Sequence, residues 1–202
     1  MTPHTRELAR LREGNERFLS GDVSVADHAA RRIGTAEGQS PFAVVIGCAD
    51  SRVPPETIFD QGIGDLFVIR IAGNVASDEA VGSTEFAVGQ LGAKLVVVLG
   101  HSACGAVRAA VQDLRSGGLD LPRSLRSIVD RIRPTAASEA DTAPESNEAE
   151  LVARAIRANV RSACAGLLAS PVLAGEHGRG ELEIVGAEYD LATGRVEFFH
   201  RE

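Results

Sequence analysis

Two short stretches of this chain carry side chains that could bind a metal ion. The first contains Cys48 within the run Gly47-Cys48-Ala49-Asp50-Ser51-Arg52, and the second, further along the chain, holds His101 and Cys104. Two thiolates and an imidazole are donors that Zn²⁺ prefers, and three protein ligands leave one coordination position open for water or substrate. The two stretches therefore predict a metal centre that is available for chemistry, provided that the fold brings them together.

Each stretch follows directly on an apolar run rich in β-branched residues. Phe-Ala-Val-Val-Ile occupies residues 42–46, and Leu-Val-Val-Val-Leu occupies residues 95–99. Runs of this kind are typical of buried parallel strands. Parallel strands place their carboxyl ends on one edge of the sheet, where open α/β sheets hold ligands. We therefore expect Cys48, His101 and Cys104 to converge at that edge.

The rest of the chain alternates between strand and helix patterns. This alternation predicts an α/β fold with a mostly parallel central sheet flanked by helices. A C-terminal antiparallel hairpin at the sheet edge is expected from two short apolar runs joined through Ala192-Thr193-Gly194. The expected strands are 42–47, 66–71, 95–99, 182–189 and 195–199, and the expected helices between them are 54–60, 78–91, 103–116, 122–133 and 147–169.

Three local expectations follow from helix and turn signals. Cys104 should lie in the first turn of the helix that starts near residue 103, where free N–H groups and the helix dipole favour a thiolate. Pro134 should end the preceding helix pattern, so that the polar residues 135–146 form a loop. The glycine-containing residues 175–180 are also expected to form a loop.

We expect one domain over residues 1–202, because this length suits one substantial core. An amphipathic pattern predicts an N-terminal helical arm at about residues 5–20, ended by Gly21. About twenty polar, mixed residues separate it from the first strand, and no element is expected there. Two placements of the arm stay open: packing on its own domain, or packing away from the core or on a partner subunit.

Composition excludes several classes of protein. Hydrophobic residues make up 44% and charged residues 24%, which are ordinary globular values. The net charge of −7 argues against a nucleic-acid partner or an anionic membrane surface. No apolar run has the length of a membrane span, and the N-terminus lacks an apolar signal core. Only 3 cysteines are present, which does not suggest a disulfide framework, so we expect a cytoplasmic protein.

The motif pair C-x-D-x-R and H-x-x-C resembles the zinc site of the β-class carbonic anhydrases. The resemblance covers most of the chain from about residue 8 onward. It extends to Asp65-Leu66-Phe67-Val68-Ile69-Arg70, Ala72-Gly73-Asn74, Gly82-Ser83 and Gly100-His101-Ser102-Ala103-Cys104-Gly105.

The resemblance implies a zinc enzyme, a carbonate dehydratase of the lyase class. Cys48, His101 and Cys104 would bind Zn²⁺, and a zinc-bound hydroxide would convert carbon dioxide reversibly to bicarbonate. Asp50 would be held off the metal by a bidentate pair with Arg52, and its carboxylate would accept the hydroxide's proton in a hydrogen bond. In some members of the family this aspartate binds the metal at low pH, so Asp50 is a possible fourth ligand in a closed state.

Gln61 matches the family's active-site amide, which donates to an oxygen of the substrate, often from the neighbouring subunit. The resemblance therefore also implies a homodimer or a higher homo-oligomer.

Two other functions stay open beside carbon dioxide hydration. One is hydrolysis of carbonyl sulfide or carbon disulfide on the same scaffold, since these linear molecules need the same nucleophile. The other is a non-catalytic member of the family that only binds zinc. A purely structural zinc site usually closes with a fourth cysteine or histidine, and only Asp50 is available here. The presence of Asp50, Arg52 and Gln61 favours catalysis.

Overall fold

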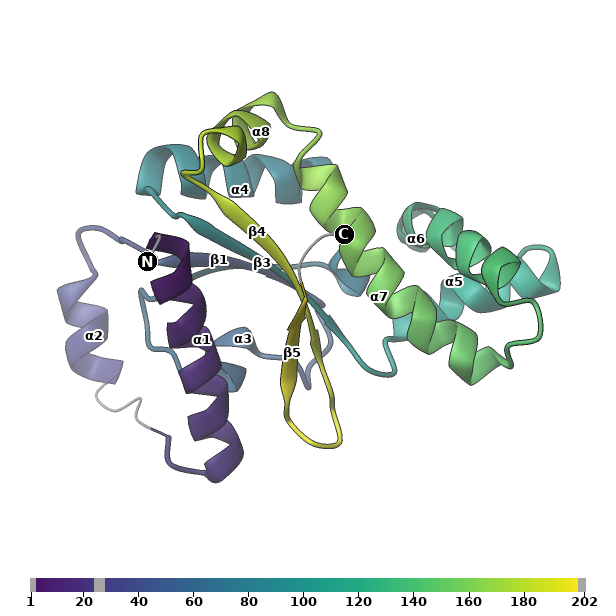
Figure 1. Cartoon of the computed structure of the whole chain (residues 1–202), viewed down its shortest axis with the longest axis horizontal. Helices are drawn as coiled ribbons and strands as arrows, with labels where there is room; N and C mark the ends of the chain where they lie inside the picture. Colours follow the sequence, from purple (N-terminus) through teal and green to yellow (C-terminus); the bar gives the residue numbers. More distant parts are fainter. Residues whose placement is uncertain (1–2, 24–27, 200–202) are drawn as a thin grey trace.

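A computed structural model describes residues 3–23 and 28–199, and its centre is one five-stranded sheet (Figure 1). The strand order is β2-β1-β3-β4-β5, in which the first four strands are parallel and β5 runs antiparallel to β4. This confirms the expected α/β fold with its C-terminal edge hairpin. The strands are β1 (Ala43–Gly47), β2 (Leu66–Arg70), β3 (Leu95–His101), β4 (Glu183–Tyr189) and β5 (Val196–Phe199).

Strand β1 lies between β2 and β3, and this order places a topological switch point between β1 and β3. The chain leaves β1 toward β2 on one side and leaves β3 toward β4 on the other. Connections that leave two adjacent strands in opposite directions open the crevice in which α/β sheets hold ligands. Every residue of β1 and β3 is buried, which explains their nearly continuous apolar sequences.

Helices cover both faces of the sheet, and a third group extends beyond its carboxyl edge (Figure 1). Alternate residues of β1 and β3 face α4, α7 and α8 on one side and α1 and α3 on the other. Helices α5, α6 and α7 pack on one another beside the strand ends. The helices are α1 (Pro3–Ser20), α2 (His28–Gly34), α3 (Pro55–Ile58), the 3₁₀ turn η1 (Ala72–Asn74), α4 (Asp78–Leu91), α5 (Gly105–Ser116), α6 (Arg123–Thr142), α7 (Glu148–Leu167) and α8 (Pro171–Gly178).

The expected N-terminal helix is present, and it packs on its own chain. Leu11 of α1 is fully buried. The side chain of Asn15 donates hydrogen bonds to the carbonyls of Ile58 at 3.1 Å and Gly194 at 3.0 Å, and it accepts one from the N–H of Val196 at 2.9 Å. Of the two placements left open by the sequence, the structure has the helix on its own sheet.

Two segments expected to be loops are largely helical, and one helix was not predicted. Helix α6 continues through Pro134 to Thr142, and the expected loop is reduced to a short connection before α7. The buried Ile132 and Ala136 flank Pro134 and keep the helix packed against its neighbours. Helix α8 occupies most of the expected glycine-containing loop, and α2 lies where no element was expected.

Among residues 3–23 and 28–199, no helix is both long and apolar enough to cross a membrane.

Candidate metal centre

The ends of β1 and β3 bring three donor side chains together. Cys48 follows β1 directly, His101 is the last residue of β3, and Cys104 immediately precedes α5. Their donor atoms all lie within 4.8 Å of one another. The three residues are 5%, 0% and 1% exposed. The predicted convergence of these residues is therefore present in the fold.

A tight turn between the second and third donors makes this convergence possible. Ala103 has φ of 55°, a left-handed conformation that is uncommon for a residue with a side chain. Helix α5 begins at Gly105, so Cys104 is the N-cap residue and does not lie in the first turn as expected. Its side chain makes no capping hydrogen bond to the first helical turn, although the nearby N–H groups of Ala106 and Val107 act to lower its pKa.

The His101 ring offers one nitrogen to a ligand. Its Nδ1 lies 2.9 Å from the carbonyl oxygen of Ser102, which favours the tautomer that carries the proton on Nδ1. The Nε2 atom is then an acceptor, yet it is buried without a hydrogen-bond partner among the described residues. An orphaned imidazole nitrogen beside two cysteines is the arrangement that a metal ion satisfies.

The two sulfurs interact with each other. The neighbouring Cys104 thiol holds the pKa of Cys48 below its usual range, against the opposing effect of burial. The same interaction and burial raise the pKa of Cys104. Metal binding requires deprotonated thiols, so a divalent cation would take the place of the remaining proton. The donor set therefore fits Zn²⁺ both in its chemistry and in its spacing.

Asp50 and Arg52 form the expected ion pair beside the donors. Arg52 donates from Nε to Oδ1 at 2.9 Å and from Nη2 to Oδ2 at 2.7 Å. These charge-assisted bonds hold the pKa of Asp50 well below its usual range. The Oδ2 atom of Asp50 lies 4.0 Å from Nε2 of His101. The carboxylate is therefore adjacent to the three donors while both of its oxygens are engaged by Arg52.

Arg70, the last residue of β2, fixes the backbone that carries Cys48 and Asp50. Its Nε donates to the carbonyl of Cys48 at 3.1 Å, and its Nη2 donates to the carbonyl of Asp50 at 2.5 Å. Sequence reasoning did not anticipate this contact. The signal that could have found it is the pairing of β1 with β2, which places Arg70 opposite Gly47.

Gln61 lies on the turn after α3, and its contacts are within its own chain. Its Nε2 donates to the carbonyl of Phe59 at 2.7 Å, and the side chain is packed against Gly14 of α1. No hydrogen bond between described residues joins Gln61 to Cys48, His101 or Cys104. The predicted contact between Gln61 and substrate therefore stays a prediction, and it depends on a second subunit.

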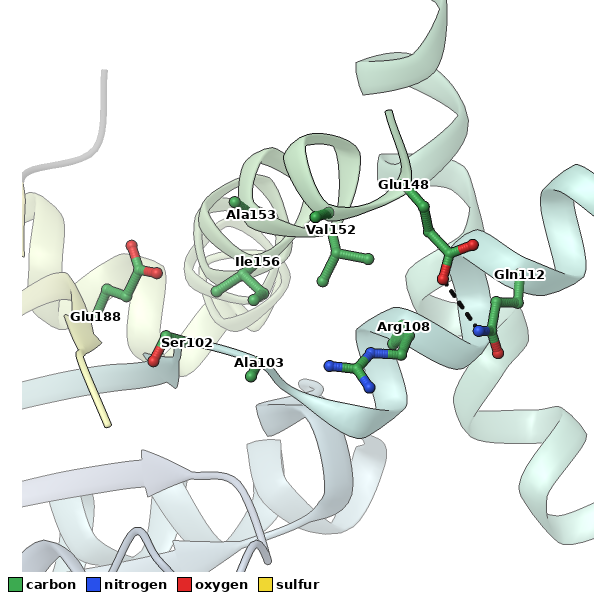
Figure 2. A pocket seen from close by; sticks show the side chains of 10 residues that line it. Ser102, Ala103, Arg108, Gln112, Glu148, Val152, Ala153, Ile156 and Glu188 are labelled. Atoms are coloured by element: carbon green, nitrogen blue, oxygen red, sulfur yellow. Dashed lines mark hydrogen bonds between the residues drawn. The ribbon is translucent and has the colours of Figure 1, made fainter. Parts of the chain in front are cut away.

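A pocket of about 440 Å³ adjoins the loop between His101 and Cys104. Ser102 and Ala103 form part of its wall, while the three donor residues do not line it. Figure 2 shows Arg108 extending into the pocket from α5, and Glu188 at the end near Ser102. Burial raises the pKa of Glu188. The pocket therefore shares the loop at Ser102 and Ala103 with the metal site without being lined by the donors.

Comparisons with known proteins identify similar chains. The sequence profile described as "Carbonic anhydrase" matches residues 43–196. Carbonic anhydrase 2 of Mycobacterium tuberculosis is 41% identical over 96% of this chain and 93% of its own length. A carbonic anhydrase of Mycolicibacterium smegmatis is 40% identical over 93% of this chain and 89% of its own.

Solved structures agree with the sequence relatives. The β-carbonic anhydrase CafA of Aspergillus fumigatus superposes with a TM-score of 0.78 at 27% identity, covering 98% of this chain and 91% of that one. A tetrameric β-carbonic anhydrase of Sordaria macrospora gives a TM-score of 0.76 at 27% identity, covering 93% of each chain.

Proposed function

Because this chain belongs to the β-carbonic anhydrase family, we propose that it catalyses the reversible hydration of carbon dioxide to bicarbonate with Zn²⁺ bound by Cys48, His101 and Cys104. Carbon dioxide hydration is the general reaction of this family of metalloenzymes. The observation that carries the proposal is the orphaned Nε2 of His101, buried within 4.8 Å of two cysteine sulfurs. A homo-oligomeric assembly and a cytoplasmic location belong to the same proposal.

The metal would supply one part of the chemistry and the protein the rest. Zn²⁺ with an open position lowers the pKa of a bound water toward neutrality. Carbon dioxide carries no charge, so the chain must orient the attacking oxygen and stabilise the negative charge that develops on the product. Asp50 would accept a hydrogen bond from the attacking group, and Gln61 of a second subunit would donate its amide N–H to a substrate oxygen.

Arg52 would determine whether the Asp50 carboxylate coordinates the metal ion or stays paired with the guanidinium. A carboxylate next to a divalent cation can coordinate it and fill the open position. The bidentate pair at 2.9 and 2.7 Å engages both oxygens of Asp50 and keeps them available only as hydrogen-bond acceptors. Asp50 would become a fourth ligand only when this pair breaks, which is the closed state expected for some members of the family.

The proposal is tested by stopped-flow measurement of carbon dioxide hydration together with zinc content. We expect the purified protein to lose activity on chelation and to regain it with added Zn²⁺. Cys48→Ser should lose both zinc and activity. Cys164→Ser is the matched control, because Cys164 is also buried but lies on α7 away from the donors, and it should keep both.

Other outcomes of the same assay would overturn the proposal. Hydration that persists after complete removal of zinc would exclude the metal mechanism. Faster turnover of carbonyl sulfide or carbon disulfide than of carbon dioxide would assign the hydrolase function instead. A zinc-loaded protein that processes none of the three substrates would be a non-catalytic zinc-binding member.

A further inference from the structure

Helix α7 carries one buried amide on a face that is otherwise apolar. Asn159 is 3% exposed, and its buried neighbours on the helix include Ala155, Ile156, Val160 and Ala163. Burying an amide costs free energy unless it is hydrogen-bonded. An asparagine is also a poorer helix former than alanine or leucine. Neither helix propensity nor apolar packing explains an asparagine at this position. The remaining explanation is the hydrogen bond that its side chain makes.

The hydrogen bond of Asn159 leads to the metal centre in two steps. Its Nδ2 donates to the carbonyl of Gly73 in η1 at 2.8 Å, across 86 positions of sequence. The N–H of the same glycine donates to the Sγ of Cys48 at 3.3 Å. The partner of Asn159 is a carbonyl oxygen, which can only accept, so the NH₂ group of the amide must face it.

The backbone of Gly73 has an unusual conformation that the hydrogen bond from Asn159 helps to hold. Its φ is 70°, and a Cβ there would lie 2.7 Å from Cδ1 of Ile132 and 3.1 Å from the Cβ of Ala106. The position therefore requires glycine, which has the widest choice of backbone conformations. Asn159 holds the carbonyl side of Gly73 while the N–H side faces the sulfur.

We propose that Asn159 is a positioning residue for the metal centre, which aims the Gly73 N–H at the Cys48 sulfur and thereby reduces the electron density that this sulfur donates to the metal. The inference rests on the proposed function, since it assumes that Cys48 is a metal ligand. Hydrogen bonds to ligand atoms tune affinity and the acidity of bound water, and their loss typically costs about 10- to 100-fold in affinity or activity. A weaker sulfur donor would leave the metal a stronger Lewis acid.

The experiment uses the full chain loaded with Co²⁺ in place of zinc, because the sulfur-to-cobalt charge-transfer band reports directly on the donor strength of the thiolates. Asn159→Ala removes the donor and leaves a cavity, whereas Asn159→Leu removes the donor and keeps a similar side-chain volume. Both should shift the charge-transfer band to longer wavelength. Both should also weaken Zn²⁺ binding about 10-fold in competition with a chelator, because the loop that positions Cys48 is no longer held and this loss of preorganisation outweighs the stronger sulfur donor. Asn159→Ser provides a milder variant in case either of the others does not fold.

The matched control is Val152→Ala, two helical turns earlier on the same buried face of α7. It should lower stability by leaving a small cavity while leaving the band and the affinity unchanged. Asn159 variants that lose stability but keep the wild-type band and zinc affinity would overturn the inference and give Asn159 a structural role only. Failure of the proposed function looks different. If the cysteines do not bind the metal, the wild-type protein itself shows no thiolate charge-transfer band; if the metal site is present without carbon dioxide hydration, the band is present and the stopped-flow assay shows no activity.

Discussion

The pairing of one carboxylate with one guanidinium determines whether the proposed metal position stays open. Both oxygens of Asp50 are held by Arg52, although one of them lies only 4.0 Å from the Nε2 of His101. At this distance the Asp50 carboxylate can bind either the metal ion or the Arg52 guanidinium. The strength of the bidentate pair with Arg52 is therefore expected to set the balance between an open and a closed centre.

Removal of the guanidinium tests this balance. In Arg52→Gln the pKa of Asp50 should rise toward its ordinary value, yet the group stays ionised at neutral pH because that value lies near about 4. The freed carboxylate should then coordinate the metal, and carbon dioxide hydration should fall about 10- to 100-fold with zinc content preserved. Stopped-flow rates and zinc analysis measure both quantities.

The control for this variant is Arg179→Gln, which removes a guanidinium from a surface pair with Glu176. Its rate should equal that of the wild type. An unchanged rate in Arg52→Gln would mean that Asp50 does not need Arg52 to stay off the metal.

At the scale of elements, α6 contains an unusual internal proline. Pro134 has no N–H to donate to the carbonyl of Asp130, and interior proline costs a helix about 3 kcal/mol relative to alanine. Pro134 itself is exposed, so its removal leaves no cavity. Proline also restricts the unfolded chain, an effect of about 0.4–1 kcal/mol in the opposite direction.

Pro134→Ala should therefore stabilise the protein by about 2–2.6 kcal/mol, measured as the free energy of unfolding in urea. Ser138→Ala, one turn later at an exposed position of the same helix, controls for helix propensity and should gain no more than about 0.5 kcal/mol. Equal or lower stability in Pro134→Ala would show that the packing of α6 against α7 depends on the proline.

The same proline marks the limit of what the sequence could predict about elements. Strands β1 and β3 were predictable because burial on both faces leaves a continuous apolar run. The continuation of α6 was not, since proline usually ends a helix and the residue that holds the next turn in the core is a small one, Ala136. Helix α2 has no buried residue and so no apolar period to detect.

At the site, too, residues with a local sequence signal were predictable, and contacts between distant segments were not. Cys48, His101 and Cys104 could be predicted because each adjoins a strand with a recognisable pattern. The contacts of Arg70 with the backbone of residues 48–50, and of Asn159 with Gly73, could not, because they depend on packing between distant segments. Sequence motifs locate donor atoms, whereas the groups that orient them are found only in the folded chain.

At the scale of the whole molecule, one chain leaves an apolar sheet edge uncovered. Strand β2 is an edge strand with partly exposed residues. Beside it, Phe86 is 49% exposed and its ring lies 6.4 Å from that of Phe67. Exposed edges with apolar surface favour association with another chain. This agrees with the proposal that a second copy contributes Gln61 to the site.

Mixing two inactive variants tests whether Gln61 acts across subunits. Cys48→Ser keeps Gln61 but lacks a metal ligand, and Gln61→Ala keeps the three donors but lacks the amide. In a mixed dimer, the donors of one chain meet Gln61 of the other, so one complete site forms. Random pairing makes half of the dimers mixed, so the co-expressed mixture should recover about a quarter of the wild-type rate in stopped-flow, and mixed dimers isolated through two different tags should recover about half.

The control pair is Cys48→Ser with His101→Ala, which should not recover because neither chain of the mixed dimer has three intact donors. Recovery in the first pair alone would place the amide and the metal on different chains, and would make assembly a condition of activity. If the first pair shows no more than the mean rate of its two parents, Gln61 acts within its own chain or not at all. The contact of its Nε2 with the Phe59 carbonyl would then describe its whole role.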